Sequence, residues 1–270
     1  METQQANTHE YSGNAVKRVQ IEVTTRCNFK CTFCAGREMY QGDMSYEDFC
    51  QVLGSHIKQY GLPEVVSLQG EGESTLHHDF FRMARFVRST GSNAYTITNG
   101  TYKHPEHFAE SFDVIGISVD SLDSDNAARF GRVNLPGTLD FIEEVANHVK
   151  QIVIHSIFLK NETPRIADWC KQHRYIHVIQ PLQSKDDYSK RYKNIRFASI
   201  QGPFECPRLI RLDHRYYNLD KLEMPCCFIK DTSEFRGIRE MIDDSKDGRW
   251  PKVCSGCSMG SSRQRKGVGR

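Results

Sequence analysis

Three cysteines stand close together near the start of the chain. Cys27, Cys31 and Cys34 lie in the segment RCNFKCTFCAG, separated by three and then two residues. In a loop, this spacing lets three thiolates converge on one inorganic centre. Three ligands on a four-iron cluster leave one iron open, and an open position separates a reactive metal site from a structural one. The spacing also allows a zinc site completed by a distant histidine, or buried thiols.

A second group of cysteines lies in the C-terminal third of the chain. Cys254 and Cys257 are separated by two residues, and Cys206, Cys226 and Cys227 precede them. Four thiolates from three separate segments can enclose a second cluster or a zinc ion in a closed site. The remaining cysteines, Cys50 and Cys170, fall inside amphipathic helical patterns and are interpreted as packing residues.

Composition is that of a globular protein with a core: of 270 residues, 38% are hydrophobic and 26% charged. A net charge of +2 provides no broad field for nucleic acid or an anionic membrane. The sequence contains no secretory signal and no run of about eighteen apolar residues. We therefore expect a cytoplasmic protein whose ten cysteines stay reduced and serve metal or redox chemistry.

Strand and helix patterns alternate along the part of the chain that contains the first three cysteines. Ser45, followed three residues later by Asp48, marks one helix start. Strands are predicted at 19–25, 64–69, 94–99, 113–120, 151–159 and 175–182, and helices at 45–60, 78–90, 137–150 and 163–173, with a short helix opening at Pro105. Six such β-then-α units imply parallel strands and right-handed crossovers. Since eight units close a full barrel, the predicted fold is α/β, an open partial (β/α)6 barrel.

The rhythm stops after about Leu182. We predict a polar N-terminal segment at 1–17, the barrel at 18–182, a linker at 183–202, a cysteine-rich domain at 203–260 and a basic tail at 261–270. The cysteine-rich region has too little apolar pattern to fold alone, and a metal centre can hold such a region together. The tail is interpreted as a solvated end, with an RNA- or partner-binding arm as the alternative.

With its triad directly after the first strand, the chain resembles the radical S-adenosylmethionine (SAM) superfamily. The resemblance implies that Cys27, Cys31 and Cys34 bind a 4Fe-4S cluster, and that SAM occupies the fourth iron through its amine and carboxylate. An electron from a flavodoxin- or ferredoxin-type donor then cleaves SAM to a 5'-deoxyadenosyl radical, which removes a hydrogen atom from the substrate.

The resemblance continues at the next strand end. Phe33 matches the family's aromatic position beside the adenine. The segment GEGES, at 70–74, stands where the family has a Gly-Gly-Glu-Pro motif, so Glu73 matches the residue that holds the methionyl amine. Glu71 and Ser74 depart from that motif. Taken alone, Glu73 could equally be a surface carboxylate.

Two further strand ends carry matching polar residues. Asn99 and Gly100 match a segment that contacts the ribose and carboxylate of SAM, and Ser118 and Asp120 are expected to be polar groups on the cofactor or substrate side. In isolation, Asn99 could be a turn former and Asp120 a helix cap. The resemblance therefore depends on the order of all these pieces behind the triad, over about residues 18–182.

Residues 203–257 are similar to the twitch form of the SPASM extension, which binds one auxiliary 4Fe-4S cluster. The family's spacing favours Cys206, Cys226, Cys254 and Cys257 as its ligands. Cys227 is then a buried neighbour or a redox-active thiol near the substrate, although it could replace Cys226 as ligand. We assign Cys227 as the candidate catalytic thiol.

Short twitch members that the chain resembles include aminocyclitol dehydrogenases and aminoglycoside epimerases. We therefore expect hydrogen abstraction from a polar small molecule, a carbohydrate or aminocyclitol, leading to oxidation or epimerisation. One alternative is a maturase that modifies a ribosomally made peptide; another, from a different class, is a non-catalytic zinc or iron-sulfur binding protein. His155 and His177 lie on predicted strands and are interpreted as packed, hydrogen-bonded residues.

Overall fold

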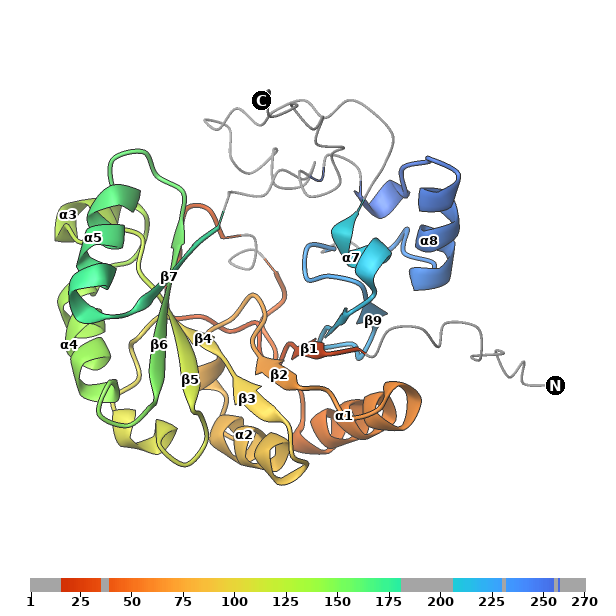
Figure 1. The fold of residues 1–270 in the computed structure, drawn as a ribbon, viewed down its shortest axis with the longest axis horizontal. Helices are drawn as coiled ribbons and strands as arrows, with labels where there is room; N and C mark the ends of the chain where they lie inside the picture. Colours follow the sequence, from red (N-terminus) through yellow and green to blue (C-terminus); the bar gives the residue numbers. More distant parts are fainter. Residues whose placement is uncertain (1–15, 35–38, 181–205, 230–231, 255–256, 258–270) are drawn as a thin grey trace, which may run out of the picture.

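The structure, a computed structural model, describes residues 16–34, 39–180, 206–229, 232–254 and 257. Its strands form two sheets (Figure 1). The five-stranded sheet has the order β3-β2-β1-β8-β9, with β3 (Asn93–Tyr95), β2 (Val65–Leu68), β1 (Arg18–Ile21), β8 (His214–Tyr217) and β9 (Glu223–Met224). The four-stranded sheet has the order β4-β5-β6-β7, with β4 (Ile97–Thr98), β5 (Val114–Ser118), β6 (Gln151–Ile157) and β7 (Ile176–Gln180). All pairs except β8–β9 are parallel, as the alternating pattern predicts.

The third predicted strand, 94–99, is divided between the two sheets. Its first half, β3, pairs with β2, and its second half, β4, pairs with β5. Thr96 stands at the division, where its hydroxyl donates to the Leu68 carbonyl (2.9 Å) and its carbonyl accepts from the Gly116 N–H (2.8 Å). The six predicted strands thus follow one another around a partial barrel, so the predicted fold class is confirmed.

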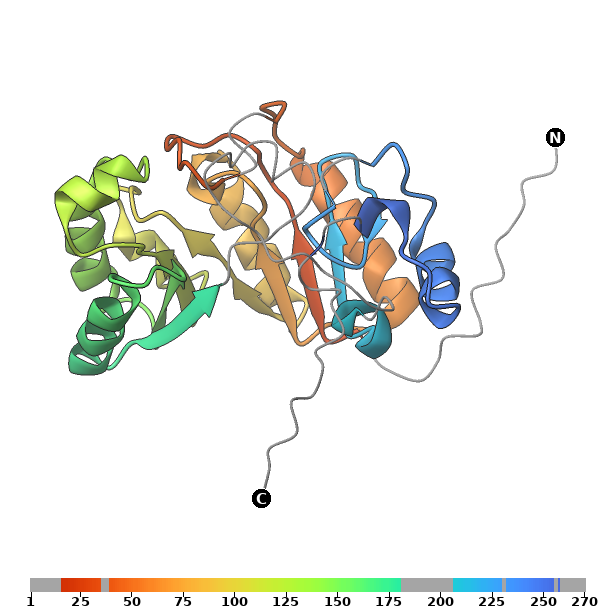
Figure 2. The same ribbon diagram turned by 90° about the horizontal axis from the view of Figure 1, so that it is seen from above.

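Helices cover the outer face of the strands (Figures 1 and 2). They are α1 (Tyr46–Tyr60), α2 (Phe80–Ser89), α3 (Ser124–Arg129), α4 (Leu135–Val145) and α5 (Thr163–His173), with 3-10 turns η2 (Ser74–Leu76) and η3 (Pro105–Phe108). As predicted, the Ser45 hydroxyl caps α1 by accepting from the Asp48 N–H (3.0 Å). Helix α4 begins two residues earlier than predicted, since Pro136 is tolerated in a first turn.

The pleat of the strands separates an outer face from an inner one. Alternate strand residues pack against the helices in one apolar core, in which Ile21, Leu68, Ile115 and Ile154 are fully buried. Their neighbours along each strand point to the opposite, inner face of the partial barrel. Several of those inner residues are polar and only half-buried, so the inner face is not filled like the core.

The C-terminal region adds strands that the sequence pattern did not indicate. Strand β8 pairs in parallel with β1 over its full length, so this region shares a sheet with the barrel. Helices α7 (Pro207–Arg211) and α8 (Ile238–Lys246) and the turn η4 (Lys252–Cys254) complete it. Within the described residues, no helix is long and apolar enough to cross a membrane. The predicted linker and tail lie outside the described residues, and the domain boundaries stay predictions.

Candidate active site

The three N-terminal cysteines occupy one loop that follows β1. Cys31 is buried, and Cys27 and Cys34 are half-buried. The Cys34 N–H donates to the Cys31 carbonyl (3.1 Å), and the Phe29 N–H donates to Cys27 Sγ (3.4 Å). Burial raises the pKa of Cys27, and the nearby charges of Glu73 and Cys31 add to that effect. Burial and like charge thus oppose the thiolate form of Cys27, and a metal centre bound by the triad would supply the positive charge that stabilises it.

Two glycines let neighbouring segments press against this loop. A Cβ on Gly72 would lie 2.5 Å from the Thr24 carbonyl oxygen and 2.6 Å from that of Arg26. On the other side, Gly131 has φ +84°, and a Cβ there would lie 2.3 Å from the Lys30 carbonyl oxygen. Both contacts are with backbone, which cannot move aside, so the loop is held between the GEGES segment and the segment that follows α3.

The carboxylate of Glu73 is buried under the triad loop, with the residue 2% exposed. Its Oε1 accepts from the Thr75 N–H (3.2 Å) and hydroxyl (2.7 Å) and from the Thr98 hydroxyl (2.7 Å). Its Oε2 accepts from the Asn99 N–H (2.6 Å). Because Oε2 accepts from one donor among the described residues, it has room for another, as an amine ligand would require.

Asn99 ties the end of β4 to the triad loop. Its Nδ2 donates to Asn28 Oδ1 (2.7 Å), and Asn28 Nδ2 donates to the Thr101 hydroxyl (2.8 Å). Gly100 has φ +75°, and a Cβ there would lie 2.9 Å from the Thr138 methyl group, so this position favours glycine. Sequence reasoning identified Asn99 and Gly100 but missed Asn28, which lies inside the triad itself.

Arg132 is a site residue that no sequence motif indicated. It forms a buried ion pair with Asp120, whose other oxygen accepts from the Ile157 N–H (2.8 Å). The guanidinium lies 5.9 Å from the centre of the Phe33 ring. Burial lowers the pKa of Arg132, but Asp120 and the thiols of the triad outweigh burial and hold the pKa above its ordinary value. Asp120 therefore positions a cation beside the triad, while Ser118 ends β5 in register with His155.

A chain of polar groups runs from the triad to the second cysteine group. Cys34 Sγ lies 4.0 Å from the backbone oxygen and from Oε2 of Glu71. The Glu71 N–H donates to Glu22 Oε1 (2.9 Å), and the Tyr216 hydroxyl donates to the Glu22 carboxylate. Burial, together with the charges of Glu22, Cys227 and Glu71, raises the pKa of Tyr216 far above its ordinary value. Glu22 and Tyr216 were not predicted as site residues.

The C-terminal cysteines gather in one apolar cluster. Cys206, Cys254 and Cys257 are buried in it, and Cys226 and Cys227 pack against it half-buried. The cluster also contains Leu209, Tyr216, Met224, Ile229, Met241 and Ile242. Because five cysteines lie in or against one apolar cluster, this donor set suits a closed, sulfur-ligated metal centre. By contrast, Cys50 and Cys170 lie in α1 and α5, and burial raises the pKa of Cys170 to about 11, as expected for a packing residue.

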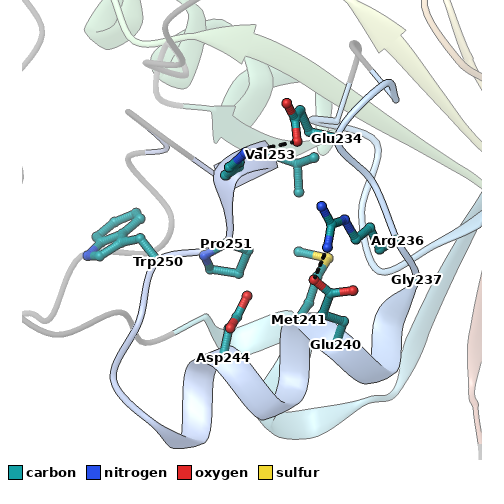
Figure 3. Close-up of a pocket in the computed structure, with 10 residues that line it drawn as sticks. Glu234, Arg236, Gly237, Glu240, Met241, Asp244, Trp250, Pro251 and Val253 are labelled. Carbon is teal, nitrogen blue, oxygen red and sulfur yellow. Dashed lines mark hydrogen bonds and ion pairs between the residues drawn. The ribbon is translucent and has the colours of Figure 1, made fainter.

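A small pocket of about 160 Å³ opens beside α8 (Figure 3). Its rim carries two ion pairs, between Arg236 and Glu240 (3.8 Å) and between Lys252 and Glu234 (3.2 Å). It is lined by Glu234, Arg236, Gly237, Glu240, Met241, Asp244, Trp250, Pro251, Lys252 and Val253. None of the predicted site residues lines it, so this pocket is separate from the triad and from the strand ends around it.

The part of the chain that contains this site matches a known protein family. The model of the Radical SAM superfamily matches residues 21–171, which include the triad, Glu73, Asn99 and Arg132. The chain belongs to the radical SAM superfamily. The family implies SAM and a 4Fe-4S cluster, and the triad loop, with its open ligand count and adjacent cation, fits them.

Relatives of this radical SAM chain carry several different names. A Selenomonas ruminantium protein named S-adenosylmethionine-dependent nucleotide dehydratase is 29% identical over 123 residues, 43% of this chain and 44% of that protein. A Pyrococcus furiosus protein named tungsten-containing aldehyde ferredoxin oxidoreductase cofactor-modifying protein is 29% identical over 149 residues, 52% and 41% of the two chains. Because the chain spans less than half of either protein, neither name transfers to it.

Among solved structures, the chain is similar to Streptococcus suis SuiB bound to S-adenosylmethionine. The TM-score is 0.65 at 14% identity, and the match covers 86% of this chain and 65% of SuiB. At this identity the similarity concerns the fold alone. It extends the shared architecture over most of the chain.

Proposed function

We propose that the chain is a twitch-type radical SAM enzyme that abstracts a hydrogen atom from a polar small molecule, a carbohydrate or aminocyclitol. The product is an oxidised or epimerised compound. The observation that carries this proposal is the meeting of five C-terminal cysteines in one buried cluster, joined to the triad through Tyr216, Glu22 and Glu71. Cys206, Cys226, Cys254 and Cys257 would hold an auxiliary 4Fe-4S cluster there.

When bound, the triad cluster and SAM supply a 5'-deoxyadenosyl radical that takes hydrogen from the substrate. The side chains around the triad would bind and orient SAM. Glu73 would accept the methionyl amine at Oε2, and Phe33 would lie against the adenine. Arg132, held by Asp120, offers a cation to the anionic groups around the triad.

Further contacts to SAM would come from neighbouring strand ends. Asn99 and Gly100, at the end of β4, would meet the ribose and carboxylate, and Ser118 lies at the end of β5. The Asn28–Asn99 hydrogen bond joins the triad loop to the end of β4. Binding of SAM at one of these segments would therefore also affect the position of the other. A flavodoxin- or ferredoxin-type protein would deliver the electron.

Cys227 bears on the choice between oxidation and epimerisation. The charge of Cys227 acts on Tyr216, which hydrogen bonds to Glu22 on the barrel side of the cluster. A thiol in that place would donate a hydrogen atom to a substrate radical and yield an epimer. If Cys227 instead replaces Cys226 as a ligand, it would help to hold the auxiliary cluster, whose chemistry would be one-electron oxidation and would favour an oxidised product.

Anaerobic reconstitution with iron and sulfide tests the proposal. We expect about eight irons per chain and release of 5'-deoxyadenosine that requires both SAM and dithionite. Two zinc ions per chain and no cleavage of SAM would instead identify a non-catalytic binding protein. A maturase would transfer deuterium to 5'-deoxyadenosine from a labelled peptide, whereas the proposed enzyme would transfer it from a labelled small molecule.

A further inference from the structure

The inner face of the barrel carries a row of polar side chains below the strand ends. Gln20 on β1 is in register with Ser67 on β2, which is in register with Tyr95 on β3. His155, on β6, joins this row through its Nε2, which lies 2.7 Å from the Tyr95 hydroxyl, and Gln69 stands two residues beyond Ser67 on the same face. We call these five residues the middle tier: Gln20, Ser67, Gln69, Tyr95 and His155.

The hydrogen bonds of His155 leave one tier donor available. Gln180 Nε2 lies 3.2 Å from His155 Nδ1, and the Tyr95 hydroxyl lies 2.7 Å from His155 Nε2. If the amide donates to Nδ1, then Nε2 carries the hydrogen and donates to the Tyr95 oxygen. Burial lowers the pKa of His155 to about 4, so the imidazole is neutral near pH 7. The Tyr95 O–H can then donate to a ligand.

Gly116 makes room for this pair. It lies in the middle of β5, where glycine usually weakens a strand. A Cβ at Gly116 would lie 2.6 Å from the Tyr95 hydroxyl oxygen and 2.9 Å from His155 Cδ2. The glycine therefore lets Tyr95 and His155 lie across the strand, which places polar atoms where an apolar side chain would otherwise fill the barrel.

Two tier atoms are buried and have no hydrogen-bond partner among the residues that the structure describes. They are Ser67 Oγ and Gln69 Oε1. Gln20 Nε2 donates to the backbone oxygen of Gln69 (3.2 Å) and not to its side-chain oxygen, so that side-chain oxygen can accept from a ligand. Buried polar atoms are rarely left unsatisfied, so these two point to an additional polar ligand.

Charge along the same face is placed above and below the tier. Glu22 stands two residues beyond Gln20, directly after β1 and toward the triad, and accepts from Tyr216 and Glu71. Arg18 stands two residues before Gln20 and is exposed. The tier itself consists of hydroxyl, amide and neutral imidazole groups and contributes no cation that could pair with a phosphate, so it suits an uncharged ligand group.

We propose that the middle tier binds a hydroxyl- or amide-bearing, uncharged part of the substrate, and that the substrate is a polar molecule without a phosphate group rather than a phosphorylated nucleotide. This inference rests on the proposed function, and it names the substrate class. Tyr95 would donate to the ligand, Ser67 would donate or accept, and Gln69 would accept. The hydrogen to be removed would lie above these contacts, on the side of the triad.

Equilibrium dialysis of the iron-loaded, SAM-bound protein tests the proposal. The probe is a bacterial metabolite extract divided by anion exchange into unretained and retained fractions, with bound compounds identified by mass spectrometry. We expect a compound of the unretained fraction to be enriched. Its enrichment should fall about tenfold in the double variant Ser67→Ala, Gln69→Leu and in Gly116→Val, because each loses tier hydrogen bonds.

The matched control is Gln172→Leu, which removes an exposed amide on α5 and should enrich the same compound as the parent. Circular dichroism and iron content show whether each tier variant is folded. Enrichment of a phosphate-bearing compound, equal enrichment by the tier variants, or no enrichment by the parent would overturn the proposal. Failure of the proposed function is seen separately, as absence of 5'-deoxyadenosine from the parent with SAM and dithionite.

Discussion

The two cysteine groups are assembled in opposite ways. The triad occupies eight consecutive positions of one loop, and its surroundings are polar and charged: Arg132, Asp120 and Glu73 all lie close to it. The C-terminal group comes from three separate segments and meets among apolar side chains such as Met224 and Met241. The first arrangement leaves charge and space for a ligand, and the second encloses its thiols.

The two environments suit different roles, with a reactive site at the triad and a stabilising site at the C-terminal cysteines. A site that must bind a charged cofactor needs fixed dipoles and counter-charges around it, which the barrel strand ends supply. A site that holds separated segments together works best when it is dry and closed. Glu71, Glu22 and Tyr216 form a polar chain that connects the triad to the C-terminal cysteine cluster.

The largest effect should come from removing one ligand on each side. We expect Cys31→Ala to abolish release of 5'-deoxyadenosine and to lower iron from about eight to about four per chain. Cys254→Ala should lower iron equally but retain cleavage of SAM without substrate. Iron analysis and chromatography of 5'-deoxyadenosine measure both. Loss of SAM cleavage in Cys254→Ala alone would reverse the roles assigned to the two groups.

A smaller effect should follow from removing the cation beside the triad. Arg132→Met leaves the Asp120 carboxylate, 1% exposed, without its partner, and should lower the free energy of unfolding by about 3–5 kcal/mol. Anaerobic urea unfolding measures this loss. The control Lys150→Met breaks the exposed pair with Asp113 and should change stability little. Adding Asp120→Asn to Arg132→Met should recover part of the loss; no recovery would mean that the buried charge is not its cause.

The smallest effect concerns the contact between the barrel and the C-terminal region. His56, on α1, is 1% exposed and lies 2.9 Å from the Tyr217 hydroxyl of β8. Burial, aided by the charge of Arg215, lowers the pKa of His56 to about 4. Because the folded pKa lies below that of the unfolded chain, the contribution of His56 is complete above about pH 6.5 and is lost as the pH falls toward 4.

We therefore expect about 3 kcal/mol of unfolding free energy to be lost between pH 7 and pH 4 through this residue. Urea unfolding across that range should show a shallower pH dependence for His56→Gln than for the parent. The control His78→Gln changes an exposed histidine and should leave the slope as it is. Equal slopes in all three proteins would show that this contact does not govern acid stability.

Much of the barrel was predictable because its signals are local. The cap at Ser45 needs only Asp48, three residues away, and α5 was predicted at its observed bounds. The division of the third strand at Thr96 was not predictable, because it depends on which neighbour each half meets. Strand β8 escaped prediction for a similar reason: HRYY has no apolar alternation, and its place beside β1 comes from pairing alone.

The residues of the candidate site also fall into those that local motifs predicted and those that depend on distant contacts. Glu73, Asn99 and Gly100 were identified because each follows a strand in a recognisable segment. Arg132 and Tyr216 were missed because they are distant in sequence from the residues they serve and belong to no motif. A glycine with positive φ next to Arg132, Gly131, was the available signal, and it indicates close approach without naming the partner.

The triad, its open ligand count and the alternation of strands and helices could all be read from residue spacing, since each depends on only a few neighbouring positions. Three other properties were visible only in the folded chain: the charges beside the triad, the apolar cluster that gathers the C-terminal cysteines, and the polar atoms that line the inner face. Those properties arise from strand register and from contacts between distant segments, and residue spacing along one chain does not specify either.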